Sequence, residues 1–441
     1  MPTLTIDPQK KFVFSDIIDF EYIDNKYIVI SRDTANWLLL DNICQVDIFK
    51  FLMTHTVEQC FNNFGKNNQK DFVKVLTEIS AKHFDDLQIN YPQTNGMYLY
   101  LTNSCNQNCN HCYMNAGKKP DNELSTKEIA SLLYNFNKMG GKVVTFTGGE
   151  ATLRDDFFEI IKVAKEYGFT VCLLTNGLLC NTAFAKEIKK YVDEVQISLD
   201  GYDAESYQVV RNSNCFPIVL ESIDNLVTEK IRTTIAITPL LNTLISNEER
   251  YCLFAKHLIN KYKDEKFFVK FNTELLDGRN ISPSEEENDL YRNAIKRIKA
   301  QISPESSSQG FALDHRCNTV FNNCGYGGVT IASNGDVYFC NLISKCKKQG
   351  NIREHDFPSI MLRSEQARIQ SDINNLIPCN SCSLKYLCGG GCRIKNFSDL
   401  VNISFSNRKN ILKINRSSPC TKEHKEGILR SMIAANKYMY R

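Results

Sequence analysis

Apolar and polar residues alternate in blocks from the middle of the chain onward, and the blocks predict repeated strand-then-helix units. Short apolar runs bounded by turn residues predict strands, and longer stretches with apolar residues every three or four positions predict helices. In the helix expected from Ser125 to Met139, Ser125 and Glu128 form a capping box. The expected strands are residues 97–102, 142–147, 169–175, 194–199, 231–237 and 267–273.

Six strands that alternate with helices imply a parallel sheet, either open or rolled into a partial (β/α)6 barrel of the TIM type. The expected fold class is therefore α/β. Ligands of such sheets bind at the carboxyl ends of the strands, so the chemistry is expected in the loops that follow them.

Three domains are expected. Residues 1–92 begin with a hairpin over 20–30, turned by Asp24-Asn25, and continue with helices, which fits a small winged-helix module. Residues 93–300 hold the strand–helix units. Residues 301–441 open with a Ser-, Gln- and Gly-rich linker at 301–316, are rich in cysteine, and end in a helix after Cys420. The helices expected in the first domain lie around residues 34–41, 44–53, 56–63 and 69–83.

Composition is that of an ordinary globular protein, with 42% hydrophobic and 23% charged residues and a net charge of +3 over 441 residues. Such a small charge gives no reason to expect a nucleic-acid or membrane surface. No apolar stretch approaches the roughly 18 residues that cross a bilayer. The first residues lack the layout of a secretory signal. We therefore expect a cytoplasmic protein that binds neither nucleic acid nor membrane.

Eighteen cysteines are the main departure from ordinary composition. Disulfides are rare in a reducing compartment, so metal ligation is the favoured explanation. Eleven of the cysteines fall into three spaced groups, and the other seven are expected to be small buried hydrophobes. Those seven are Cys44, Cys60, Cys172, Cys180, Cys215, Cys252 and Cys346.

The first group follows the first expected barrel strand, where Cys105, Cys109 and Cys112 are spaced C-x3-C-x2-C. A loop this short can wrap three thiolates around one cluster and leaves the fourth iron of a cubane open. A structural zinc site is the alternative. It needs four ligands, and His111, directly beside Cys112, is poorly placed to be the fourth.

This spacing, followed by the aromatic Tyr113, resembles the defining motif of the radical S-adenosylmethionine (SAM) superfamily, and the resemblance extends across the strand–helix segment. It implies that the open iron binds SAM, which is cleaved to methionine and a 5′-deoxyadenosyl radical that abstracts a hydrogen atom from the substrate. Gly148, Gly149 and Glu150 look like the family's GGE motif, which would receive the methionine amino group.

Other positions resemble further SAM contacts. Ser198 and Asp200, at the end of the fourth strand, match the family's ribose-binding position. Arg211 lies in a stretch similar to one that delivers an arginine to the SAM carboxylate, with a surface salt bridge as its alternative. Asn176, after the third strand, either lines the same SAM site at the carboxyl ends of the strands or simply forms a turn.

The remaining cysteines resemble the SPASM extension found on many radical SAM enzymes, with Cys324 and Cys340 in the pattern C-x10-G-x4-C. The resemblance implies two auxiliary [4Fe–4S] clusters, three clusters in all, that transfer electrons or are structural. Zinc ribbons are the alternative. One auxiliary cluster would be held by Cys317, Cys324, Cys340 and Cys392, and the other by Cys379, Cys382, Cys388 and Cys420.

SPASM enzymes mostly modify peptides, so the resemblance implies a maturase of ribosomally made precursor peptides, served by a flavodoxin or ferredoxin-type electron donor. Residues 1–92 resemble the peptide-recognition element of such enzymes, whose exposed β-edge captures the leader as an added strand. A crosslink or another oxidation would follow hydrogen abstraction. No catalytic residue can be assigned from the sequence.

Two other functions remain open. Sulfatase-maturing enzymes oxidise Cys or Ser to formylglycine, but they carry an acidic residue where this chain has Asn341. A cluster-based redox regulator would use the winged helix to bind DNA. Residues 1–92 contain nine Lys and Arg against thirteen Asp and Glu, and an acidic module argues against binding to phosphates.

Overall fold

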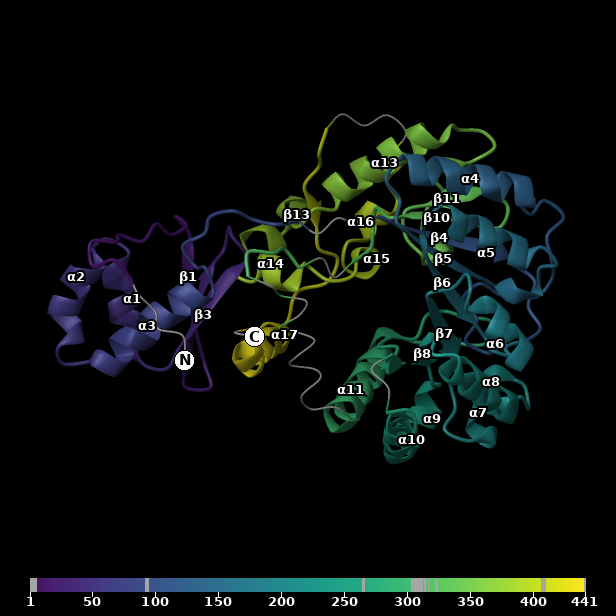
Figure 1. Cartoon of the computed structure of the whole chain (residues 1–441), viewed down its shortest axis with the longest axis horizontal. Coiled ribbons are helices and arrows are strands. Elements are labelled where there is room, and N and C mark those ends of the chain that lie inside the picture. The colour runs from purple at the N-terminus through teal and green to yellow at the C-terminus, as the bar shows by residue number, and fades with distance from the viewer. Residues whose placement is uncertain are drawn as a thin grey trace.

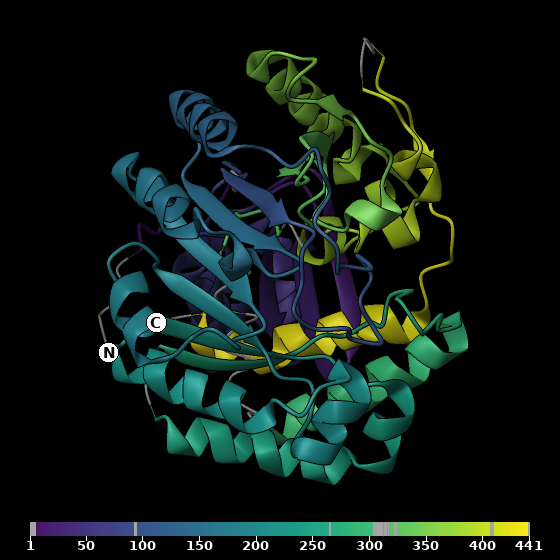
Figure 2. The same cartoon turned by 90° about the vertical axis from the view of Figure 1, so that its right-hand side faces the viewer.

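A computed structural model describes residues 6–91, 95–263, 266–302, 312, 315, 317–321, 324–405 and 410–439. Its centre is a nine-stranded sheet in the order β12-β11-β10-β4-β5-β6-β7-β8-β9 (Figures 1 and 2). Most of the linker expected at 301–316 lies outside the described residues. Within the described ranges, no helix is both long and apolar enough to span a membrane.

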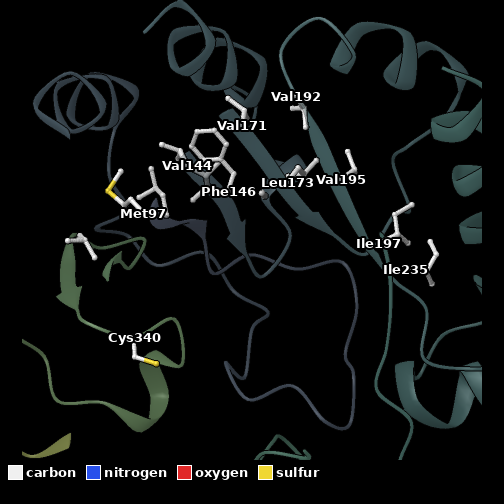
Figure 3. Close-up of a cluster of buried hydrophobic side chains, with 14 of the residues drawn as sticks. Met97, Val144, Phe146, Val171, Leu173, Val192, Val195, Ile197, Ile235 and Cys340 are labelled. Carbon is white, nitrogen blue, oxygen red and sulfur yellow. The ribbon is translucent and has the colours of Figure 1, made fainter. Parts of the chain in front are cut away.

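Six neighbouring strands of this sheet are parallel and follow one another in chain order, which confirms the predicted α/β partial barrel. Alternate apolar side chains, such as Val144, Phe146 and Leu173, are buried on one face of the strands (Figure 3). Because side chains alternate across a strand, their neighbours face the barrel interior. The six strands are β4 (Gly96–Thr102), β5 (Val143–Gly148), β6 (Thr170–Thr175), β7 (Glu194–Ser198), β8 (Arg232–Ile237) and β9 (Phe267–Phe271).

Helices cover the outer face of the barrel (Figure 1). The predicted capping box is confirmed, because Ser125 and Glu128 bond to each other's backbone at the start of α4. The apolar face of α4, which includes Ile129 and Leu133, is fully buried. The helices of this domain are α4 (Thr126–Lys138), α5 (Phe157–Glu166), α6 (Thr182–Ile188), α7 (Ala204–Arg211), α8 (Phe216–Thr228), α9 (Leu241–Ser246), α10 (Glu248–Lys261) and α11 (Glu285–Ile302).

Three short strands of the C-terminal domain extend the barrel sheet, which the sequence did not predict. Strand β10 (Val329–Ile331) runs parallel to β4, and β11 (Asp336–Tyr338) and β12 (Gly350–Asn351) add antiparallel strands beyond it. The predicted terminal helix is confirmed as α17 (Lys422–Ala435). The other elements are α13 (Phe357–Gln370), β13 (Leu376–Ile377), α14 (Lys385–Cys388), α15 (Arg393–Asn396), α16 (Ser398–Val401) and β14 (Ile414–Asn415).

The N-terminal module is a three-stranded antiparallel sheet followed by helices. The predicted hairpin is confirmed, and Asp24 and Asn25 turn it with φ angles of 49° and 58°. The helix expected over 34–41 is wrong, because residues 36–40 form a strand that pairs with β2. The winged-helix identity of the module stays a prediction. Its elements are β1 (Ile18–Ile23), β2 (Lys26–Ser31), β3 (Asn36–Leu40), α1 (Ile43–Leu52), α2 (Val57–Cys60) and α3 (Gln69–Ala81).

The module packs against the C-terminal domain through one face of its sheet. Ile28, Ile30 and Trp37 share an apolar cluster with residues of α14 and α17, whereas the opposite face packs on the module's own helices. Lys82 is fully buried at this junction: its Nζ lies 3.7 Å from the centre of the Trp37 ring and donates to Asn436 Oδ1 at 2.5 Å. Burial lowers the pKa of Lys82 to about 8.

Candidate active site

Cys105, Cys109 and Cys112 lie in the loop that follows β4, at the carboxyl end of the barrel. Burial raises the pKa of the Cys105 and Cys109 thiols, and the three sulfurs are close enough to interact electrostatically. Two N–H groups approach them: the Ala116 amide donates to Cys112 Sγ at 3.4 Å, and Arg211 Nη1 donates to Cys109 Sγ at 3.5 Å. Such donors stabilise thiolate ligands, so the loop fits a three-thiolate cluster.

The glycines of the Gly148-Gly149-Glu150 segment bring the end of β5 against this loop. The Gly149 amide donates to Thr102 O at 2.8 Å, and the Glu150 amide donates to Ser104 O at 2.8 Å. A Cβ atom on Gly149 would lie 2.3 Å from Ser104 O. Only glycine allows so close an approach of two backbones.

We expect Gly149→Ala to displace the cysteine loop, because Ser104 O cannot give way without moving the backbone beside Cys105. The variant should lose SAM cleavage and most of its radical-site iron, measured as 5′-deoxyadenosine formed and iron bound after anaerobic reconstitution. The control is Gly117→Ala, since nothing lies within 4 Å of a Cβ atom at that position. Equal iron content and activity in both variants would contradict the expectation.

The Glu150 carboxylate is buried and ties neighbouring strands together. It accepts hydrogen bonds from Thr175 Oγ1 at 2.8 Å and from the Asn176 amide at 2.7 Å. Asn176 in turn donates from Nδ2 to Asn106 Oδ1 at 2.7 Å. Asn176 therefore contacts the cysteine loop besides turning the chain after β6, and Glu150 fixes the relative position of the β5 and β6 ends.

Asp200 and Arg211 form a buried ion pair beside the cysteine loop, and the partly buried His111 contacts the same carboxylate. Arg211 Nε lies 2.5 Å and His111 Nε2 lies 2.9 Å from Asp200 Oδ2, while the Thr238 amide donates to Asp200 Oδ1 at 2.7 Å. Burial acts to raise the pKa of Asp200, but the charge of Arg211 and the hydrogen bond with His111 hold it below its usual value. Arg211 is itself buried, so its ion pair is not at the surface. Ser198, half-buried, ends β7 two residues earlier.

Tyr113 connects the cysteine loop to the C-terminal domain. Its hydroxyl lies 2.9 Å from the hydroxyl of Tyr100 on β4, and Tyr100 donates to Asn341 O at 2.6 Å. Asn341 is the residue after Cys340. Burial raises the pKa of both phenols, so both stay protonated at neutral pH. A continuous set of contacts thus runs from Cys112 to Cys340.

The structure brings together one of the two sets of auxiliary cysteines predicted from the sequence. Cys379, Cys382, Cys388 and Cys420 are close enough to interact. Nitrogen atoms lie beside two of these sulfurs: His424 Nε2 is 3.4 Å from Cys388 Sγ, and Arg416 Nη1 is 3.8 Å from Cys379 Sγ. This set fits a cluster with four protein ligands.

The other predicted set is only partly assembled. Cys324 and Cys392 are close enough to interact electrostatically, and so are Cys340 and Cys392. Cys317 instead lies near Lys82 and Glu78. Across the described part of the chain, no three His, Cys, Asp or Glu side chains are grouped so that they could hold a metal ion directly.

Sequence reasoning missed several residues that hold the cysteine loop. Gln107 Nε2 donates to Tyr207 OH at 2.7 Å, Arg279 Nη1 donates to Cys109 O at 3.0 Å, and the Asn280 amide donates to Asn110 O at 2.9 Å. Arg279 and Asn280 could have been found from the polar turn Asp277-Gly-Arg-Asn280. This turn follows the last barrel strand, and parallel sheets bind their ligands at the carboxyl ends of the strands.

Comparisons with known proteins match both parts of this site. The radical SAM superfamily model matches residues 99–249, and the SPASM model, an iron–sulfur cluster-binding domain, matches residues 323–383. The mycofactocin maturase MftC of Mycolicibacterium smegmatis is 28% identical over 305 residues, 67% of this chain and 77% of that protein. An AdoMet-dependent heme synthase of Nitratidesulfovibrio vulgaris is 26% identical over 321 residues, 68% of this chain and 87% of that protein.

The fold agrees with these matches. The solved structure of native anSMEcpe with bound AdoMet superposes with a TM-score of 0.56 and 17% identity, covering 78% of this chain and 98% of that one. The chain therefore contains a radical SAM domain and a C-terminal SPASM domain, which makes it an enzyme that uses S-adenosylmethionine and [4Fe–4S] clusters.

Proposed function

We propose that the enzyme is a maturase that modifies a ribosomally made precursor peptide. The observation that carries the proposal is the accessible edge strand β1 of the N-terminal module. This module is joined to the radical SAM and SPASM domains in one chain. The similarity to mycofactocin maturases over two thirds of the chain supports it. The product would be a crosslink or another oxidation within the peptide.

The described geometry supports the cofactor sites that we propose. A cluster at Cys105, Cys109 and Cys112 would supply the electron that cleaves SAM to the hydrogen-abstracting radical. The chain's own part is to hold the cofactor at the mouth of the barrel. Two auxiliary clusters, giving three in all, would sit in the SPASM domain. The proposed SAM contacts are Tyr113, Gly148, Gly149, Glu150, Asn176, Ser198, Asp200 and Arg211.

The edge that would capture the leader is β1. The two-residue turn of this hairpin is closed by the hydrogen-bonded pair Ile23 and Lys26. Hydrogen-bonded and non-hydrogen-bonded pairs alternate along an antiparallel ladder, so the amides of Phe20 and Tyr22 point away from β2. Among the described residues, neither amide makes a backbone hydrogen bond with another segment. Phe20 and Tyr22 are 37% and 60% exposed. An extended peptide can therefore pair with this edge.

The opposite edge, β3, is less suitable. All five of its residues are buried. The amide of Trp37 already donates to Asn36 Oδ1 at 2.8 Å. An incoming strand would have to displace both this bond and the packing around it, so β1 is the edge that we propose.

Residue chemistry favours this function over sulfatase maturation. Asn341 directly follows Cys340, and an amide cannot accept a proton as a carboxylate base does. The proposed enzyme acts in the cytoplasm, where a flavodoxin or ferredoxin-type protein would reduce it. Electrons released by substrate oxidation would leave through the SPASM domain, from which contacts run back to Tyr113.

Phe20→Pro tests leader capture, because proline removes the outward amide of β1 and leaves the ladder to β2 intact. We expect at least about tenfold weaker binding of a labelled leader peptide, equal to about 1.4 kcal/mol, measured by fluorescence anisotropy with the full-length enzyme. Phe20→Ala, which keeps the amide, should retain most of the binding.

The same preparation tests the reaction. With SAM, reductant and the precursor peptide, the product mass should fall by about two hydrogens per crosslink as 5′-deoxyadenosine forms. Unmodified peptide together with duplex DNA binding would support a regulator. Formylglycine in a sulfatase peptide, or oxidation of a porphyrin substrate, would replace the proposed activity with that of the corresponding relatives.

A further inference from the structure

The segment between β9 and α11 lies against the cysteine loop, and Arg279 makes its main contacts. Arg279 Nη1 donates to Cys109 O at 3.0 Å, Nη2 donates to Ala116 O, and Nε donates to Asn115 Oδ1 at 3.0 Å. All three nitrogen atoms are used, and the planar fork of a guanidinium fixes the directions of such bonds. One side chain thus joins the middle of the loop to the residues that follow its last cysteine.

The neighbours of this arginine also follow the loop closely. The Asn280 amide donates to Asn110 O at 2.9 Å, and Asn280 Nδ2 donates to Asn110 Oδ1 at 2.7 Å. A Cβ atom on Gly278 would lie 2.6 Å from the carbonyl carbon of His111, so only glycine fits there. Residues 278–280 therefore contact both residues that lie between the last two cysteines of the loop.

A second element, α7, holds the same loop in a different way. The Asn110 amide donates to Val210 O at 2.9 Å. Arg211, the last residue of α7, donates to a sulfur, Cys109 Sγ, at 3.5 Å. The bonds of Arg279 go instead to backbone carbonyls and to a side-chain amide. One arginine therefore acts on a thiolate, and the other acts on the backbone that carries it.

The segment that presents this arginine is itself fixed on two sides. The Leu275 amide donates to Asn288 Oδ1 at 2.9 Å, and Asn288 Nδ2 donates back to Leu275 O at 3.1 Å. Asn288 is a buried residue of α11, so these bonds anchor the segment to the barrel. On the other side, Lys395 Nζ of the SPASM helix α15 lies 2.8 Å from Glu274 Oε1. The guanidinium is therefore held on a fixed support.

We propose that Arg279 is a positioning residue of the radical site, which fixes the backbone of the cysteine loop in the arrangement that SAM cleavage requires. The inference concerns SAM cleavage alone and does not depend on the peptide that we propose as substrate. Because Arg279 binds the backbone and leaves the three thiols in place, a cluster should still assemble without it. The loop would then be less firmly held, and a displacement of about 1 Å can lower a rate by about 10²-fold.

The test uses the reconstituted full-length enzyme and needs no precursor peptide. Arg279→Ala removes the fork, and Arg279→Lys keeps the charge but offers one ammonium in its place. Arg297→Ala is the matched control, because Arg297 pairs with Glu248 and its side chain is 56% exposed. Each protein is assayed for bound iron, for 5′-deoxyadenosine formed with SAM and reductant, and for the urea midpoint. Hydrogen exchange of residues 105–117 and the EPR signal of the reduced cluster with SAM are also measured.

Both Arg279 variants should keep the iron content of the wild type but form 5′-deoxyadenosine at least about tenfold more slowly. Their cysteine loops should exchange amide hydrogens faster, and their EPR signals with SAM should differ from that of the wild type. The control should match the wild type in every measurement.

Four results would overturn the proposal. They are wild-type cleavage in either Arg279 variant, unchanged exchange of the loop, loss of the radical-site iron, and a lower urea midpoint with an unchanged EPR signal. Loss of iron would mean that Arg279 is needed for assembly of the cluster, and the last result would mean that its role is purely structural. None of these results bears on the maturase function, which is tested separately by modification of the peptide.

Discussion

Replacing Cys105, Cys109 and Cys112 with Ala should abolish 5′-deoxyadenosine formation and lower the bound iron from about twelve to about eight. The three sulfurs interact in one loop, and two N–H donors approach them. Without thiolates, this loop has nothing to hold a cubane or present its open iron to SAM. The measurements are chromatography of the nucleoside product and an iron assay on anaerobically reconstituted protein.

The control for this experiment is Cys252→Ala, since Cys252 is a buried barrel cysteine outside the three spaced groups. It should retain about twelve irons and wild-type cleavage of SAM. If the triple variant still cleaved SAM, or if the wild-type protein bound zinc in place of iron, the assignment of the radical site would be wrong.

The second large effect is expected for Asp200→Asn. The substitution keeps the shape of the side chain but leaves the buried Arg211 guanidinium without its carboxylate partner, which lies at 2.5 Å. Removing one partner of a buried ion pair costs about 3–5 kcal/mol. We expect the apoprotein to unfold at a markedly lower urea concentration. The loss should be smaller after reconstitution, because the negatively charged thiolate cluster beside Arg211 offsets part of its charge.

Glu194→Gln is the matched control, because Glu194 pairs with Arg232 while the two side chains are 37% and 50% exposed. Exposed pairs contribute at most about 1 kcal/mol, so its urea midpoint should stay near that of the wild type. Similar midpoints for the two variants would mean that the Asp200–Arg211 pair is not buried in solution. A second readout is the reduction potential of the radical-site cluster, which a purely structural role of Asp200 would leave unchanged.

Strand and helix positions in the barrel could be predicted because each element carries its own signal. The runs that became β4 to β9 are bounded by turns, and Ser125 and Glu128 mark the start of α4. The error at residues 36–40 arose because Trp37-Leu-Leu-Leu40 has no turn residue and suits a helix equally well. Residues 36–40 form a strand because they pair with β2 and are buried on both faces of the sheet. Strands β10 to β12 are too short to give a pattern and depend on β4 for partners.

Within the site, cysteine spacing was informative because a short loop restricts where its thiolates can lie. Individual polar residues gave no comparable signal. Asp200 and Arg211 were assigned to different parts of SAM, but the structure pairs them with each other.

The hydrogen bonds between β10 and β4 restrict how a substrate can enter. Val329 to Ile331 pair with Met97 to Leu99, so one continuous sheet crosses from the barrel into the SPASM domain. Swinging the two domains apart at this seam would expose unpaired amides and carbonyls on both strands. Any hinge that admits a long, flexible molecule must therefore lie elsewhere. Strand β9 is at the far end of the sheet, and among the described residues an opening of the barrel rim beyond it breaks no ladder.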